Sequence, residues 1–143
     1  MTLKLIDYLF EAPEIEDIDF GYCAKYARLA AKELTDAEYI PGDAWDLGKK
    51  NKVVKELTQK ENLNDFKEFL YPGETIVIFY NPLSIHNKRN RTGTHAALYL
   101  GKDSESDELL FAQEYLGNQL TAKYGEMMDL MILSPRQILD VKG

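Results

Sequence analysis

The sequence is poor in the residues that build metal and disulfide sites. Its 143 residues include one cysteine and two histidines. A single thiol excludes an intramolecular disulfide framework, and this set does not supply the four Cys and His ligands of a structural zinc site. We therefore expect a protein with no metal and no cofactor.

Basic residues and long apolar runs are also scarce. Seventeen Lys and Arg stand against 24 Asp and Glu, which gives a net charge of −7. Nucleic-acid-binding domains are normally basic, and a membrane span needs about 18 apolar residues or more, so neither partner is expected. The N-terminus lacks a basic-then-apolar signal pattern, which predicts a cytoplasmic protein as synthesised, with non-classical export or phage delivery left open. The oligomeric state is left open.

Hydrophobic residues make up 45% of the chain, enough for a core in one domain spanning residues 1–143. The first half has helical patterns. A short amphipathic helix is expected over Leu3–Phe10, and Gly21 favours a second helix that begins at Tyr22 or Cys23. The remaining helical predictions are a segment capped by Asp43 that runs through Trp45 and Leu47 to Val53, Val54 and Leu57, and one or two turns over Leu63–Leu70.

The second half predicts strands, the first of them from a run of β-branched and aromatic residues. These are Thr75–Tyr80, His95–Leu100, Leu109–Glu114, Gln119–Tyr124 and Met128–Leu133. A polar loop over Asn81–Thr94 is long for so small a domain and leads directly into His95, so it is a candidate lid or specificity loop. Helices followed by a run of strands predict an α+β fold, with helices packed on an antiparallel sheet of about five strands.

Cys23 is the first candidate for chemistry. A lone cysteine on an alanine-rich helix is often only a small core residue, but the first turn of a helix favours an anion and therefore a thiolate. A thiolate nucleophile needs a base, and the choices are His95, at the mouth of a strand, and His86, in the polar loop. Each histidine also has a plain structural interpretation, His95 as a hydrogen-bonding strand residue and His86 as a surface residue.

Three short motifs occur along the chain in the same order as in a known family. Gly21-Tyr22-Cys23-Ala24-Lys25-Tyr26 resembles the Gly-x-Cys-x-x-Tyr start of the CHAP family, the cysteine, histidine-dependent amidohydrolases/peptidases. Tyr71-Pro72-Gly73-Glu74 resembles that family's strand entry, and Gly93-Thr94-His95-Ala96 resembles the strand that bears its histidine. Similar elements occur in NlpC-type cell-wall peptidases. The resemblance covers about residues 21 to 118.

This resemblance implies a papain-like thiol hydrolase core with Cys23 as nucleophile and His95 as general base. Gln113, preferred over its neighbour Glu114, would orient the imidazole, although the family's Glu-x-Asn pattern is replaced here by Gln113 and Tyr115. Candidate oxyanion or substrate-binding residues are Tyr22, Trp45, Tyr115 and Glu114.

The implied activity is that of a cysteine amidase or endopeptidase acting on peptide or isopeptide bonds, most plausibly in peptidoglycan stems. Two alternatives stay open. The same Cys–His pair could serve a protein deamidase or acyltransferase, and the scaffold could be a catalytically weak binding module.

Overall fold

The computed structural model describes residues 10–18, 22–58, 60–80, 94–131 and 133–141. The helix expected over Leu3–Phe10 and the loop residues 81–93, which include His86, fall almost entirely outside this part of the chain.

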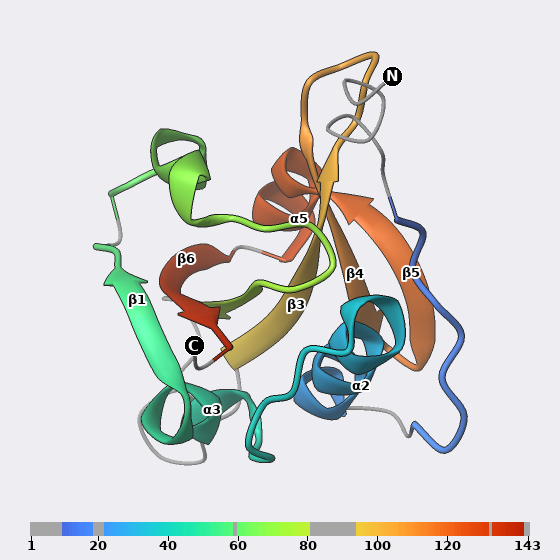
Figure 1. The fold of residues 1–143 in the computed structure, drawn as a ribbon. Helices are drawn as coiled ribbons and strands as arrows, with labels where there is room; N and C mark the ends of the chain where they lie inside the picture. The colour runs from blue at the N-terminus through green and yellow to red at the C-terminus, as the bar shows by residue number, and fades with distance from the viewer. Residues whose placement is uncertain (1–9, 19–21, 59, 81–93, 132, 142–143) are drawn as a thin grey trace.

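A six-stranded antiparallel sheet forms the centre of the molecule, with the strand order β1-β6-β2-β3-β4-β5 (Figure 1). The strands are β1 (Lys52–Glu56), β2 (Ile76–Tyr80), β3 (Thr94–Lys102), β4 (Leu109–Tyr115), β5 (Asn118–Lys123) and β6 (Ser134–Asp140). Together with the helices described below, this sheet confirms the predicted α+β class and the antiparallel arrangement.

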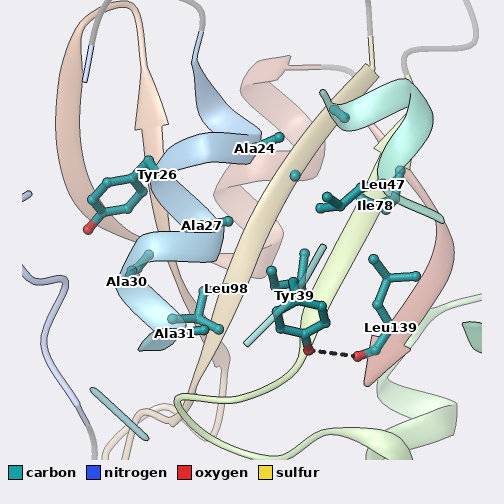
Figure 2. Close-up of a cluster of buried hydrophobic side chains, with 14 of the residues drawn as sticks. Ala24, Tyr26, Ala27, Ala30, Ala31, Tyr39, Leu47, Ile78, Leu98 and Leu139 are labelled. Carbon is teal, nitrogen blue, oxygen red and sulfur yellow. Dashed lines mark hydrogen bonds between the residues drawn. The ribbon is translucent and has the colours of Figure 1, made fainter. Parts of the chain in front are cut away.

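Helix α2 (Cys23–Thr35) covers one face of the sheet over β3 and β4 (Figure 1). Its inward side is built from small residues, with Ala24, Ala27, Ala30 and Ala31 all buried. Alanine is the best helix former and lets the helix axis approach the sheet closely, onto a surface that includes Ile78 and Leu98 (Figure 2). The helix ends at Asp36, whose left-handed backbone lets its N–H bond to the Lys32 carbonyl.

The opposite face of the sheet carries a second core of larger side chains. Phe79 and Phe111 are fully buried there, with ring centroids 5.6 Å apart in an edge-to-face contact. The 3₁₀ helix η1 (Leu63–Phe69) and helix α5 (Tyr124–Met131) add Leu63 and Met127 to this core. The sheet therefore separates two apolar layers, and the face on which a side chain lies decides which neighbours it meets.

Two sequence predictions are wrong about where elements begin and end. The predicted helix after Asp43 stops early: α3 spans Ala44–Lys50, and Lys52–Glu56 form strand β1 instead. β1 pairs with β6, the last strand of the chain, so a long-range contact decides the conformation of Val53 and Val54. β-branched residues adapt readily to such a pairing.

The other error concerns the C-terminal quarter. The strand predicted over Met128–Leu133 falls mostly in helix α5, and the strand forms later, as β6. β6 pairs on one side with β1 and on the other with β2, so it is a central strand. Central strands are held by hydrogen bonds on both edges, and this pairing is invisible in the local sequence.

The segment 10–18 runs alongside edge strand β5 (Figure 1). Gln119 on β5 holds it with both ends of its amide: Oε1 accepts from the Ile15 N–H at 2.8 Å, and Nε2 donates to the Ile15 carbonyl at 2.8 Å. Tyr26 donates its hydroxyl to the Pro13 carbonyl at 2.8 Å. Side-chain bonds thus cover an edge that would otherwise be open to another chain.

Candidate active site

Cys23 is the first residue of α2, as the breaker Gly21 predicts. The N-cap residue Tyr22 makes no side-chain cap, so backbone N–H groups at this end of the helix stay available. The backbone N–H groups of Ala96, Ala24 and Cys23 itself point toward the sulfur. Three donors around the sulfur are the kind of surroundings that can stabilise a thiolate.

Burial nevertheless outweighs these donors. The pKa of the Cys23 thiol is raised to about 11, mainly by removal of the sulfur from water; the N–H of Ala96 opposes this rise, and the nearby Glu114 carboxylate adds to it. A thiol with this pKa is protonated at neutral pH. The expectation that the helix N-terminus would give a resting thiolate is therefore wrong, because desolvation is the larger effect.

His95 and Gln113 form the most buried polar contact of the site. The Gln113 Oε1 atom lies 2.7 Å from His95 Nε2, and the two residues are 3% and 7% exposed, respectively. Because an amide oxygen only accepts, this contact places the proton on Nε2 and leaves Nδ1 as the basic nitrogen. Of the two neighbours, Gln113 is the residue that contacts the His95 ring.

Glu114 points to the other side of β4, since neighbouring strand residues alternate between faces. Its side chain is 2% exposed, and its Oε2 atom accepts the Gly117 N–H at 2.8 Å in the tight turn between β4 and β5. It thus lies within electrostatic reach of Cys23 and opposes ionisation of the thiol.

Burial also governs the imidazole. It lowers the pKa of His95 from 6.5 to about 4, while the bond to Gln113 works in the opposite direction without cancelling it. Burial disfavours the charged form of either group. At neutral pH the site therefore holds a neutral thiol and a neutral imidazole.

The Cys23 thiol and the His95 imidazole lie at the same end of β3 but on different faces of the sheet. His95 shares its face with Phe79, whose ring centroid is 6.3 Å from that of the imidazole, whereas α2 and Ala96 lie on the other face. Within the described part of the chain, no hydrogen bond links the Cys23 thiol to the His95 ring. The thiol instead meets the strand at the N–H of Ala96, one residue beyond His95.

The sheet is open at this point. β2 pairs with β3 from Thr94 onward, but the described ladder between β3 and β4 begins only at Leu98 and Ala112. The first residues of β3 and the last residues of β4 are therefore not paired with each other, although β3 still pairs with β2 and β4 with β5. This gap lets the N–H of Ala96 point toward a sulfur rather than a strand partner, and lets His95 reach Gln113 on the adjacent strand.

The other candidate residues have different surroundings. Tyr115 is 37% exposed, and its ring meets the His95 ring edge-on, with centroids 6.5 Å apart. Tyr22 is 49% exposed, with the Lys25 ammonium 5.7 Å from its ring centroid. Trp45 lies in α3, and its side chain is outside the described residues.

Sequence reasoning missed Thr94, which it placed in the polar loop. Thr94 is the first residue of β3, and its Oγ1 atom is buried without a hydrogen-bond partner. Its alternation with His95 places it on the α2 face, like Ala96. The sequence gives no signal that the Thr94 hydroxyl is buried without a partner, because this follows only from how the folded chain packs around it.

Comparison with protein-family models, curated proteins and solved structures gives no match to this chain. Across the described residues, no group of three or more His, Cys, Asp or Glu side chains is placed to hold a metal ion. No helix in that same part of the chain has the length and apolar character needed to cross a bilayer. The chemistry of the candidate site must therefore be argued from its own residues.

Proposed function

We propose that this protein is a cysteine-dependent amide hydrolase, an amidase or endopeptidase with a papain-like core, in which Cys23 is the nucleophile and His95 the general base. The observation that carries the proposal is the buried 2.7 Å contact between His95 and Gln113, next to the residue whose N–H meets the Cys23 sulfur. A buried imidazole with a fixed tautomer, one residue before the Ala96 whose N–H meets the only thiol of the chain, supports a role in acyl transfer.

The neutral resting state sets the order of the steps. As the substrate carbonyl reaches the sulfur, the thiol proton passes to Nδ1 of His95 and the S–C bond forms. The imidazolium then gives that proton to the departing amine as the C–N bond breaks, which leaves a thioester. Water attacks the thioester, His95 takes its proton and returns it to the sulfur, and the carboxylic acid leaves.

Gln113 acts through His95. By accepting from Nε2–H it holds the ring with Nδ1 unprotonated, and it stabilises the transient imidazolium less than a carboxylate would. The backbone N–H groups at the start of α2 are the donors available to the developing oxyanion. The exposed rings of Tyr22 and Tyr115 would form apolar walls for the substrate.

The resemblance to CHAP and NlpC enzymes supports a peptide or isopeptide bond of peptidoglycan as the substrate. The direct test is to incubate purified peptidoglycan with the protein and identify released stem fragments by mass spectrometry. Cys23→Ala and His95→Ala should abolish release, whereas His86→Ala, the change at the other histidine, should leave it intact. Deamidation of an intact protein without chain cleavage would instead support the deamidase alternative.

The second candidate is a binding module that has lost turnover. It is favoured by the raised pKa of the thiol, the lowered pKa of the imidazole and the lack of a described bond between them. A binding module should co-sediment with peptidoglycan without releasing fragments, and Cys23→Ala should bind equally well. Fragment release that depends on Cys23 would exclude it.

A further inference from the structure

A small pocket lies at the far half of α2, away from Cys23. Its volume is about 260 Å³, and it opens between the outer side of the helix and the segment that follows the helix. The helix lines it with Arg28, Leu29 and Lys32, and the following segment with Ala37, Glu38 and Tyr39. The left-handed turn at Asp36 is what folds this segment back against the helix.

Arg28 is the unusual member of this lining. Its Nε atom is buried, yet it has no hydrogen-bond partner, and no ion pair joins its guanidinium to another residue in the described ranges. A buried donor without an acceptor costs about 1–3 kcal/mol. Because Arg28 lines the pocket, an acceptor that enters the pocket can bind its guanidinium.

The second cation is already neutralised. The Lys32 ammonium lies 2.8 Å from the Asp36 carboxylate and also contacts that of Glu38. The Tyr39 hydroxyl is engaged too, since it donates to the Glu74 carbonyl at 2.5 Å. The guanidinium of Arg28 is therefore the one lining cation in this described pocket whose charge no neighbour balances.

We infer that this pocket binds the carboxylate of a small, largely apolar molecule through Arg28. A guanidinium presents two parallel N–H groups that match the two oxygens of a carboxylate. Leu29, Ala37 and the ring of Tyr39 supply an apolar wall for the body of the ligand. The Glu38 carboxylate on the rim selects against a doubly charged anion such as phosphate. The volume limits the ligand to a small molecule.

This site is independent of the proposed hydrolase activity, because none of its residues belongs to the site around Cys23. The test is to titrate the whole protein with sodium benzoate and follow the Arg28 Nε–H signal by ¹⁵N NMR. We expect a saturable shift and slower exchange with water, which sodium chloride at equal ionic strength does not reproduce. A shift that chloride reproduces would overturn the inference.

Three variants sharpen the test. Arg28→Lys keeps the charge but loses the paired N–H groups, so benzoate binding, followed through backbone amide shifts, should weaken by about tenfold, the worth of one charge-assisted hydrogen bond. Glu38→Gln removes a negative charge from the rim and should tighten binding. Lys25→Gln, a matched change on α2 outside the pocket, should leave it unchanged. Unaltered binding in Arg28→Lys, or tighter binding of inorganic phosphate than of benzoate, would refute the proposal.

Discussion

His95 should make the stability of this fold sensitive to mild acid. Its pKa falls from 6.5 to about 4 on folding because the ring is buried. The unfolded chain therefore binds a proton at a pH where the folded chain does not, and protonation favours unfolding. The stability is fully present above pH 6.5 and is lost as the pH falls toward 4.

The structure also gives the magnitude. Each unit of pKa difference is worth about 1.4 kcal/mol, so the full loss from the two pKa values is about 3 kcal/mol. Between pH 7 and pH 5 the contribution of His95 to the free energy of unfolding should fall by about 2 kcal/mol. That loss is a sizeable part of the total stability of a domain of this size.

The assay is urea unfolding at pH 7 and pH 5. His95→Gln should lose about 2 kcal/mol less between the two pH values than the unaltered protein, since glutamine does not titrate. His86→Gln, the same change at the other histidine, is the control for removal of an imidazole. Carboxyl groups titrate equally in all three proteins and cancel in the comparison. Equal losses in the unaltered protein and His95→Gln would refute the reasoning.

Three further changes test other parts of the structure. Glu114→Gln should lower the pKa of the Cys23 thiol, measured from the pH dependence of iodoacetamide labelling, because it removes a buried negative charge near the sulfur; an unchanged profile would contradict that coupling. Gly73→Ala should lower the free energy of unfolding in urea more than Gly117→Ala does. Both glycines have a positive φ, so that cost is shared. A Cβ at Gly73 would lie 2.8 Å from neighbouring side chains, whereas a Cβ at Gly117 would have no atom within 4 Å. Gln119→Ala should speed amide exchange in residues 10–18, since it removes both hydrogen bonds from Gln119 to Ile15; faster exchange in β5 alone would show that these bonds do not hold the segment.

The sequence alone determined the parts that depend on local chemistry. Glycine before an alanine-rich run was enough to place the start of α2 at Tyr22 or Cys23, and a run of β-branched and aromatic residues was enough to locate β2. Strand alternation also showed that only one of Gln113 and Glu114 can face His95, and the preference for Gln113 came from the resemblance.

Tertiary structure decided whatever depends on distant partners. Val53 and Val54 are in a strand because β6, more than 80 residues further along the chain, pairs with them. Likewise, the charge state of Cys23 follows from burial, since the helix end and its N–H groups are visible in the sequence but the loss of water around the sulfur is not. The desolvation of a group depends on every neighbour that the fold brings to it, and this is why the sequence pointed to a thiolate while the folded chain holds a neutral thiol.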